Sequence, residues 1–474
     1  MGLYSASAIG ILLSVLIFML IRTFIAKKQT IAKKPYIDKD FIPNNKRYEQ
    51  TLSRMITHAT ISTENNETSE VQALHTYLKE RFPLIESTCE WKNIDGGLLI
   101  KWTGRSEIRP LLLMSHLDVV PAKGEWRKPA FSGDIKNGII WGRGAVDTKG
   151  SLCAIFEAVE SLLKENFIPD CDIYIFASSR EEIAGEDAAK AAAFLKENGI
   201  TPRLVIDEGG AILDNPMAGV SGRFAMIAMS ERGSAKILLT AGRKLNKPGM
   251  EQLARFVLKM KKTRLSDSKL APEVKAMFSE LTPSMSFGLR FIFSNLWLFQ
   301  SLILKLLPKI SSEAAAMIGA TISFSNLSGD EADKLPIGTC GMNATVATTY
   351  YQNIENCTSD FIKLAEKAGL SASLSLLRET VKPEPVESSG YNYVADTVRS
   401  VFEDVKPSPF IIFGGTDARH FVDLSESVIR FAPLHFTKEQ LASVHSPNEH
   451  LHSASLSDGV RFYREAIKNI SDLK

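Results

Sequence analysis

The stretch that most constrains the fold spans residues 110–121 and reads PLLLMSHLDVVP. Its apolar half leads into a short polar turn, which is typical of a buried strand in a parallel sheet. Side chains two positions apart on an extended backbone point the same way, so His116 and Asp118 are expected to face one site. A neutral imidazole is a common zinc ligand, and a carboxylate close by can orient it. Taken alone, such a histidine is more often structural, so the prediction depends on what the neighbouring strands carry.

Two later apolar strands run into acidic residues in the same manner. The run at 172–178 is followed by Glu181 and Glu182, and the run at 204–206 is followed by Asp207. Strands that alternate with helices over this part of the chain predict a doubly wound α/β sheet. Ligands of such sheets bind outside the carboxyl ends of the strands, so these acidic residues are expected to lie near His116.

A glycine-rich turn between these strands carries a further carboxylate. Residues 139–150 read IIWGRGAVDTKG, and the glycines allow the close backbone turns that hold Asp147 at the start of the next helix. Read alone, Asp147 could simply cap that helix. Five carboxylates and a histidine gathered on one face would, however, repel one another unless cations lay among them. The pattern therefore predicts a metal site.

Two imidazoles and three carboxylates suit two zinc ions that share one bridging carboxylate, although Co²⁺ or Mn²⁺ could replace zinc. The expected second imidazole is His445, because Pro447 and Asn448 favour a rigid turn that would hold it. The predicted metal ligands are His116, Asp147, Glu182, Asp207 and His445.

Within this set Asp147 is the expected bridge between the two ions. His116 and Asp207 would complete one site, and Glu182 and His445 the other, leaving an open position for water. Of an adjacent glutamate pair, one side chain can bind metal while the other takes a proton from the attacking water, which typically contributes about 10² to 10⁴-fold. We assign Glu181 as this base and Asp118 as support for His116, although spacing alone does not order the two glutamates.

An apolar segment near the N-terminus approaches the roughly 20 residues needed to span a bilayer. Residues 8–25 read AIGILLSVLIFMLIRTFI and carry one charge. Four lysines follow the segment between residues 27 and 34, and no A-x-A cleavage site is present, which favours a single-pass anchor over a cleaved signal peptide. The positive-inside rule would leave the bulk of the chain on the cytoplasmic side, but folded domains can be exported despite such charges, so the side stays open.

The 474 residues exceed one typical core, so more than one domain is expected. The pattern changes near residue 231, and a separate α+β unit follows before Pro383 and Pro385 mark the return to the first domain. The predicted divisions are an anchor with its basic flank (1–34), a catalytic domain in two parts (35–230 and 381–474) and an inserted lid or dimerisation domain (231–380).

The long apolar and aromatic segment 286–307 lies inside the predicted lid. Its interior Arg290 and Asn295 argue against a second membrane span and favour a buried or membrane-leaning hairpin. Beside an N-terminal anchor, such a hairpin suggests lipid-like substrates, but it is equally compatible with a simple lid core.

Composition excludes several other classes of protein. The net charge is +2 with 23% charged residues, so a nucleic-acid partner is not expected. The five cysteines are scattered and lack C-x-x-C spacing, which argues against both a disulfide framework and a cysteine zinc site.

Seven motifs occur in the order found in a known family: SHLDVVPA, WGRGAVDTKG, the pair of glutamates, IDEGG, GGTDARHF, RFAP and HSPNE. The chain resembles the dinuclear zinc aminoacylase and carboxypeptidase S family, especially the branch that acts on N-acyl amino acids. The resemblance implies an α/β catalytic domain interrupted by a lid that often mediates homodimers. It also implies hydrolysis of an amide next to a free carboxylate, in a peptide or an N-acyl amino acid. It supports the roles given above to His116, Asp118, Asp147, Glu181, Glu182, Asp207 and His445.

Two departures from the family pattern affect the predicted lid. The family's Gly-His-Ser-Ser, whose histidine stabilises the oxyanion, is replaced here by TAGRKLNKP at 240–248, where Arg243 could supply the charge. The family's Arg-x-x-Pro, which contacts a substrate carboxylate, is replaced by a stretch with Gln352 in the place of the arginine. Two readings follow: a working metallohydrolase with an altered lid, or a metal-holding protein that binds a carboxylate ligand or partner with little turnover. The presence of Glu181 favours the first reading.

Overall fold

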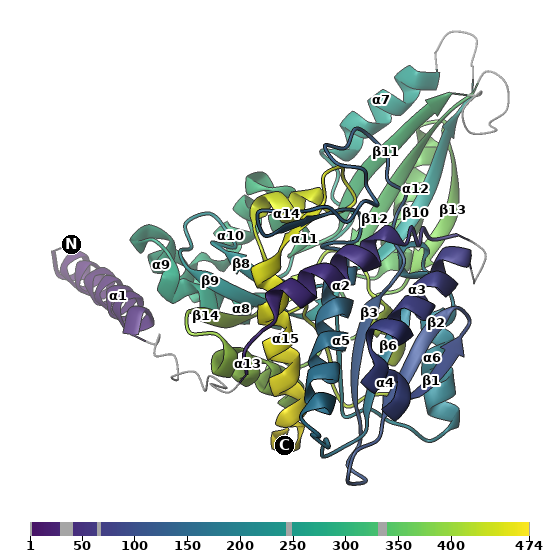
Figure 1. Cartoon of the computed structure of the whole chain (residues 1–474). Coiled ribbons are helices and arrows are strands. Elements are labelled where there is room, and N and C mark those ends of the chain that lie inside the picture. Colours follow the sequence, from purple (N-terminus) through teal and green to yellow (C-terminus); the bar gives the residue numbers. More distant parts are fainter. Residues whose placement is uncertain (1, 29–40, 64–67, 243–248, 330–338, 474) are drawn as a thin grey trace.

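The computed structural model describes residues 2–28, 41–63, 68–242, 249–329 and 339–473, and within the N-terminal helix it describes the side chains of residues 9–26. A large α/β body carries a smaller sheet that extends from one side, while the N-terminal helix α1 (Gly2–Lys28) lies on the other side (Figure 1).

A ten-stranded sheet forms the centre of the large body. Its strands are β1 (Glu90–Ile94), β2 (Gly97–Trp102), β3 (Leu111–His116), β6 (Ile173–Ser178), β7 (Leu204–Asp207), β8 (Ala211–Asp214), β9 (Arg223–Glu231), β14 (Val405–Ile412), β15 (Val428–Arg430) and β16 (His435–Phe436). They lie in the order β1-β2-β6-β3-β7-β15-β9-β8-β16, and β14 pairs with β9. Strand β3 runs parallel to β6 and β7, whereas β2 runs antiparallel to β1 and β6. The predicted α/β class is confirmed, but the sheet is mixed and not uniformly parallel.

Helices cover both faces of this sheet. One face carries α2 (Asn45–Thr57), α3 (Ser69–Arg81), α4 (Pro83–Thr88), α5 (Lys149–Lys164), α13 (Ser389–Val401) and α15 (Ser453–Lys468), and the other carries α6 (Asp187–Glu197) and the 3₁₀ helix η3 (Asp417–Phe421). Along β3, Leu111 and Leu113 pack on the first side while Leu112 and Met114 pack on the second. Side chains of a strand alternate between the two faces, so a strand buried on both sides reads as a continuous apolar run.

A small three-stranded sheet connects the C-terminal part of the chain to the glycine-rich turn. It contains β4 (Ile135–Lys136), β5 (Ile139–Trp141) and β17 (His450–His452), with β5 in the centre. The helix α14 (Lys438–Ser443) ends just before His445. This pairing places the turn that holds His445 beside Asp147, although about 300 residues separate them in the sequence.

A second, antiparallel sheet lies within the range predicted to form the lid. It has the order β11-β12-β10-β13 and comprises β10 (Gly233–Ala241), β11 (Thr321–Gly329), β12 (Cys340–Thr348) and β13 (Ser371–Arg378), with α7 (Gly249–Met260) and α12 (Ile354–Lys367) packed on it. Ile237 and Leu239 of β10 are buried with Phe256 and Phe361 of these helices. The domain boundaries and dimerisation through this sheet stay predictions.

The helices that follow α7 and precede β11 share a core with strands of the large sheet. They are α8 (Pro272–Leu281), the 3₁₀ helix η2 (Thr282–Ser284), α9 (Phe287–Ser294), α10 (Leu296–Ile310) and α11 (Ser312–Ala316). Met277 and Phe278 of α8 share a core with Met226 of β9 and Ile411 of β14. The axes of α9 and α10 are bent by 111° at Asn295, so the segment forms a bent helical hairpin (Figure 1).

Candidate metal centre and active site

The predicted site residues lie at the ends of three neighbouring strands. His116 is the last residue of β3, Asp207 is the last residue of β7, and Glu181 opens the short 3₁₀ helix η1 (Glu181–Ile183) that follows β6. Strands β6, β3 and β7 are adjacent and parallel, so their carboxyl ends meet at one edge. Asp147 reaches this edge from the glycine-rich turn before α5.

Two imidazoles contact the carboxylate of Asp147, and one of them also contacts Glu182. His116 Nε2 lies 3.0 Å from Asp147 Oδ1, and His445 Nε2 lies 3.0 Å from Asp147 Oδ2. The same His445 nitrogen lies 3.0 Å from Glu182 Oε2. Ligand atoms of His116, Asp147 and Glu182 all fall within 4.8 Å of one another, which is close enough for them to share a metal ion.

The hydrogen bonding of His116 shows why a cation fits this cluster. Its Nδ1 lies 3.0 Å from the backbone carbonyl of Asp118, which can only accept, so Nδ1 carries a proton. In a neutral ring Nε2 then presents a lone pair to the Asp147 carboxylate, and two acceptors at 3.0 Å need a proton or a metal ion between them. This donor set, imidazole nitrogens facing carboxylate oxygens, is one that zinc accepts.

Nearby carboxylates raise the pKa values of both imidazoles. Burial opposes protonation of His116, yet the carboxylates of Asp118 and Asp147 outweigh it and hold the pKa of His116 well above the usual value. Hydrogen bonds to Asp147 and Glu182 raise the pKa of His445 to about 10. The negative charge that favours a proton on each imidazole would equally favour a cation between these groups.

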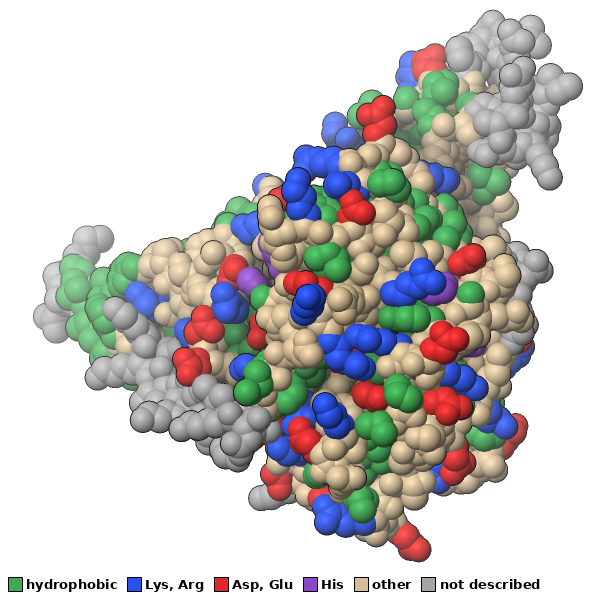
Figure 2. Space-filling view, in the orientation of Figure 1, with side chains coloured by type: hydrophobic (Ala, Val, Ile, Leu, Met, Phe, Trp, Pro, Cys, Tyr) green, Lys and Arg blue, Asp and Glu red, His purple; other side chains and the backbone are tan. Residues whose placement is uncertain are grey.

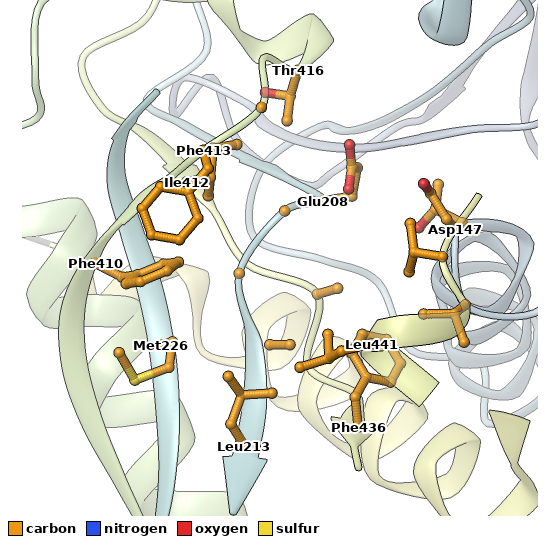
Figure 3. Close-up of a pocket in the computed structure, with 18 of the residues that line it drawn as sticks. Asp147, Glu208, Leu213, Met226, Phe410, Ile412, Phe413, Thr416, Phe436 and Leu441 are labelled. Carbon is orange, nitrogen blue, oxygen red and sulfur yellow. The ribbon is translucent and has the colours of Figure 1, made fainter. Parts of the chain in front are cut away.

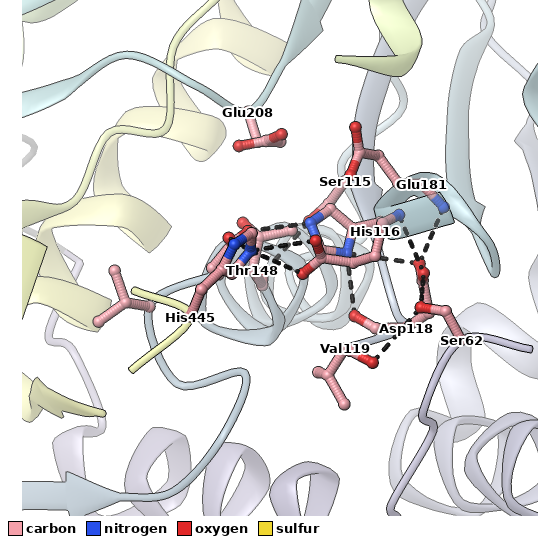
Figure 4. Close-up of polar contacts among 12 residues, drawn as sticks. Ser62, Ser115, His116, Asp118, Val119, Thr148, Glu181, Glu208 and His445 are labelled. Atoms are coloured by element: carbon pink, nitrogen blue, oxygen red, sulfur yellow. Dashed lines mark hydrogen bonds and ion pairs between the residues drawn. The ribbon is translucent and has the colours of Figure 1, made fainter. Parts of the chain in front are cut away.

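The side chain of Asp207, a predicted metal ligand, is hydrogen-bonded to backbone groups, whereas the adjacent Glu208 faces the cavity. The two carboxylate oxygens of Asp207 accept hydrogen bonds from the backbone N–H groups of Glu208 (2.8 Å) and Ala418 (2.9 Å), so Asp207 fixes η3 to the end of β7. Glu208 instead lines the same cavity as Asp147 and Glu182 and lies across from His116 and His445 (Figure 4). Burial and the negative charge of Asp147 raise the pKa of Glu208 well above its usual range.

The alternation of side chains along β7 explains this difference. Ile206 packs in the core on the α5 side, whereas Val205 packs with Ala418 on the α6 side. Asp207 continues the alternation and meets Ala418 on the α6 side. The sequence did show an acid next to Asp207, but which of the two enters the site depends on the face that each occupies.

Asp118 holds the two adjacent glutamates in place. Its Oδ1 accepts a hydrogen bond from the backbone N–H of Glu181 (3.2 Å), and its Oδ2 accepts one from that of Glu182 (3.2 Å) and one from the Ser62 hydroxyl (2.5 Å). Asp118 Oδ1 also lies 3.5 Å from His116 Nδ1. One carboxylate thus orients the imidazole and the start of η1 together.

The Glu181 side chain is half-buried and lines the cavity beside Glu182. Burial, aided by repulsion from Asp417 and Glu208, raises the pKa of Glu181 well above its usual value. A carboxylate whose pKa is raised toward the working pH is better suited to accept and return a proton.

Glu449 is a supporting residue that the sequence did not reveal. Its carboxylate is fully buried, pairs with Arg143 Nη1 at 2.5 Å, and accepts hydrogen bonds from the backbone N–H groups of Val146 (2.8 Å) and Asp147 (3.1 Å). It therefore fixes the turn that presents Asp147. The contact joins residues about 300 positions apart, and no local pattern marks it.

The two predicted lid substitutions have different outcomes. Arg243 lies outside the described residues. Gln352 is buried, and its side-chain carbonyl accepts hydrogen bonds from the hydroxyl and the backbone N–H of Thr349, while its amide nitrogen reaches the Asp267 carbonyl. Gln352 therefore fixes the turn that precedes α12.

A cavity of about 540 Å³ opens from the cluster (Figure 3). Its polar end carries Asp147, Glu181, Glu182, Glu208 and His445; Glu313 of α11 also lines the wall, and the rest of the lining is mostly apolar. The apolar lining includes Leu213, Met217, Met226, Met277, Leu281, Met317, Phe410, Ile412, Phe413, Phe436 and Leu441. The cluster of histidines and carboxylates thus lies at one end of a largely apolar cavity.

Comparison with known proteins agrees with this site. The chain is 30% identical to a probable carboxypeptidase S-like 2 of Dictyostelium discoideum, over 97% of this chain and 92% of the relative. It is 31% identical to the N-fatty-acyl-amino acid synthase/hydrolase PM20D1 of Xenopus tropicalis, over 86% of this chain and 82% of the relative. The resemblance stated from the motifs is confirmed.

Solved structures share the fold. An M20 family metallo-carboxypeptidase from Sulfolobus solfataricus superposes with a TM-score of 0.65 at 17% identity, covering 90% of this chain and 99% of that one. Human carnosine dipeptidase 1 superposes with a TM-score of 0.66 at 13% identity, covering 90% and 97%. Residues 112–469 match the profile of peptidase family M20/M25/M40, and the chain is therefore a hydrolase that belongs to this family.

Proposed function

We propose that this protein is a metal-dependent hydrolase that cleaves the amide bond of N-acyl amino acids with long acyl chains. The main observation behind this proposal is that the cluster of histidines and carboxylates opens into a largely apolar cavity of about 540 Å³. A relative of similar length is named an N-fatty-acyl-amino acid synthase/hydrolase, which supports the same substrate class.

His116, Asp147, Glu182, Glu208 and His445 would hold two zinc ions, with Asp147 as the bridge and Glu208 in place of Asp207. This set of metal ligands is supported by the distances of 3.0 Å between imidazole nitrogens and carboxylate oxygens. Co²⁺ or Mn²⁺ would fit the same nitrogen and oxygen donors. When bound, the ions would polarise the amide carbonyl and make water a stronger nucleophile.

The residues of the chain would supply the proton transfers. Glu181 takes a proton from the attacking water and returns it to the leaving nitrogen, because its carboxylate lines the cavity and its pKa is raised. Asp118 keeps Glu181 and His116 in register through its hydrogen bonds. Glu449 keeps the Asp147 turn in place.

The apolar wall favours an acyl chain over a peptide. A peptide would bring amide groups against side chains such as Met226 and Phe410, which offer no hydrogen-bond partner, and burying an unpaired amide costs several kcal/mol. A hydrocarbon chain instead gains about 0.8 kcal/mol for each methylene group that leaves water. Carboxypeptidase-like cleavage of peptides is the second candidate, supported by the carboxypeptidase S-like relative.

We also propose that α1 anchors the protein to a membrane. Residues Ile9–Ala26 form the one described helix that is long and apolar enough to cross a bilayer alone. Most of its apolar side chains are exposed, as a lipid-facing surface requires. A signal sequence near an N-terminus would share these features, and N-terminal sequencing of the mature protein separates the two.

Hydrolysis by the zinc-loaded full chain in detergent tests the proposal. The panel comprises one amino acid acylated with chains of 2 to 18 carbons together with matched dipeptides. The proposal expects kcat/KM to rise with chain length until the cavity is filled. Faster cleavage of dipeptides would favour the carboxypeptidase, and bound zinc without cleavage of any member would favour the metal-holding binding protein.

A further inference from the structure

The bent hairpin formed by α9 and α10 lies directly against α1. Arg22 Nε donates a hydrogen bond to the Ser294 carbonyl at 2.9 Å, and Asn295 Nδ2 donates one to the Met19 carbonyl at 3.3 Å. The rings of Phe18 and Trp297 lie 6.3 Å apart. Met19 and Thr23, on the same side of α1, are buried by this contact. The hairpin and the proposed anchor are therefore one continuous structure.

The outer surface of the hairpin is apolar although it faces away from the protein. Four aliphatic side chains repeat every four residues along α10 and are between 44% and 69% exposed: Leu298, Leu302, Leu306 and Ile310. Trp297 is 56% exposed and Phe287 is 51% exposed. Figure 2 shows hydrophobic side chains gathered on the end of the molecule where α1 lies. An exposed apolar surface of this kind, continuous with the proposed membrane anchor, is expected to meet lipid.

The stripes along α10 fit a helix that lies in a membrane interface. Ile303 and Leu307 point into the core that includes Met277. The exposed aliphatic stripe is bordered by a second exposed stripe in which Lys305 and Lys309 lie four residues apart. Lysines beside an apolar stripe can extend to lipid headgroups while the aliphatic side chains enter the acyl region.

The contacts with α1 also determine how deep in the bilayer the bend of the hairpin would lie. Ala26 ends the apolar window of α1, and Met19 and Arg22 precede it by seven and four residues. At 1.5 Å per residue, the bend of the hairpin lies about 6 to 10 Å inside the edge of the span. Interfacial helices lie at about 5 to 10 Å, whereas a second span would need to cross about 30 Å.

We propose that the α9–α10 hairpin is a second membrane contact, which dips into one leaflet beside α1 without crossing it and lets substrate enter the cavity from the bilayer. The entry route rests on the proposed function, while the membrane contact does not.

The inner side of the hairpin is continuous with the cavity wall. Ile303 and Leu307 of α10 share their core with Met277 and Leu281 of α8, which line the cavity. The turn after β8 also joins the two, because Met217 lines the cavity and the Gly219 carbonyl accepts a hydrogen bond from the backbone N–H of Ser286 at 2.9 Å. The inner side of α10 and the wall of the space proposed for the acyl chain thus belong to one apolar core.

Quenching of tryptophan fluorescence by lipids brominated on their acyl chains tests the membrane contact. The full chain is reconstituted in phosphatidylcholine vesicles with and without the brominated lipid. Trp297 is one of five tryptophans, so we expect loss of up to about one fifth of the emission, as for a tryptophan at a membrane interface. Trp297→Phe should abolish this loss, and Trp91→Phe, in a strand at the far edge of the large sheet, should retain it. Equal quenching of the wild type and Trp297→Phe would overturn the proposal.

A pair of charge substitutions tests the entry route. Leu298→Glu places a charge on the hairpin, and Ile168→Glu places one on a comparably exposed aliphatic position of the large body, the two residues being 50% and 57% exposed. We expect Leu298→Glu to slow hydrolysis of a vesicle-embedded long-chain substrate roughly tenfold, because charge is costly in the acyl region, and to leave a soluble short-chain substrate unaffected. Ile168→Glu should change neither rate. If Leu298→Glu slowed hydrolysis of both substrates equally, the proposed entry route would be refuted. If lipid quenched Trp297 in a protein that hydrolysed no substrate, the membrane contact would be supported and only the proposed function would be refuted.

Discussion

The adjacent acids Asp207 and Glu208 allow a sharp test of how the metal centre is built. Each is replaced by its amide, as Asp207→Asn or Glu208→Gln, so that size is preserved and only the charge and one acceptor are lost. If Glu208 is the ligand, Glu208→Gln should weaken binding of one metal ion by more than the about 10 to 100-fold that is typical when a residue merely supporting a ligand is changed. Asp207→Asn should leave two ions bound.

The two variants should also differ in the stability of the metal-free protein. In Asp207→Asn the new amide group faces a backbone N–H, of Ala418 or of Glu208, and a buried donor without an acceptor costs about 1 to 3 kcal/mol. Glu208 has a pKa raised by burial, so the folded state binds more protons than the unfolded state, and this carboxyl weakens stability as pH rises above its unfolded pKa. Glu208→Gln should therefore stabilise the metal-free protein at pH 7.

Metal content after dialysis, measured by plasma mass spectrometry, and urea unfolding of the chelator-treated proteins provide the two readouts. The reasoning expects opposite effects: Glu208→Gln loses metal and gains stability, and Asp207→Asn keeps metal and loses stability. The reasoning would be refuted if Asp207→Asn retained one metal ion while Glu208→Gln retained two.

Three further predictions follow from other parts of the structure. Glu449→Ala leaves Arg143 buried without its partner and should lower the free energy of unfolding by about 3 to 5 kcal/mol, measured in urea; a change below 1 kcal/mol would contradict the role of this pair. Met277→Trp should fill the space of two or three methylene groups of the acyl chain, each worth about 0.8 kcal/mol. We therefore expect kcat/KM for the longest acyl substrate to fall by about 15 to 60-fold, with little effect on acetyl substrates. An equal loss of kcat/KM for both substrates would contradict the placement of the acyl chain. Burial lowers the pKa of Lys149 to about 7, so between pH 7 and about 10 the unfolded state binds more protons than the folded state and stability rises with pH. Lys149→Met should remove about 1.4 kcal/mol per pH unit of this rise, measured by urea unfolding at several pH values. Parallel plots of stability against pH for the wild type and the variant would contradict this prediction.

Local patterns predicted most of the elements that build the site. The apolar run at residues 204–206 and its neighbours became β7, β3 and β6, because strands buried on both faces need continuous apolar sequence. His445 was identified from the turn chemistry of Pro447 and Asn448, and it does meet Glu182 and Asp147. Such features are encoded within a few residues, so they can be read without knowing the fold.

Features that depend on distant contacts could not be read in this way. Glu449 meets Arg143 across about 300 residues, and the choice between Asp207 and Glu208 depends on which face of β7 meets η3. Helices α8 to α11 pack on the large sheet although they lie within the range predicted for the lid. In each case tertiary packing decided between alternatives that were equal in local sequence.

The measurement that tests the central claim most directly is amide hydrolysis by the wild type and Glu181→Gln at equal metal content. The full chain is loaded with zinc, the bound metal is quantified, and release of the free amino acid from a long-chain N-acyl substrate is followed. Loss of the general base should lower kcat by about 10² to 10⁴-fold while two metal ions stay bound. A Glu181→Gln protein that retains both ions and turns over at the wild-type rate would contradict the account.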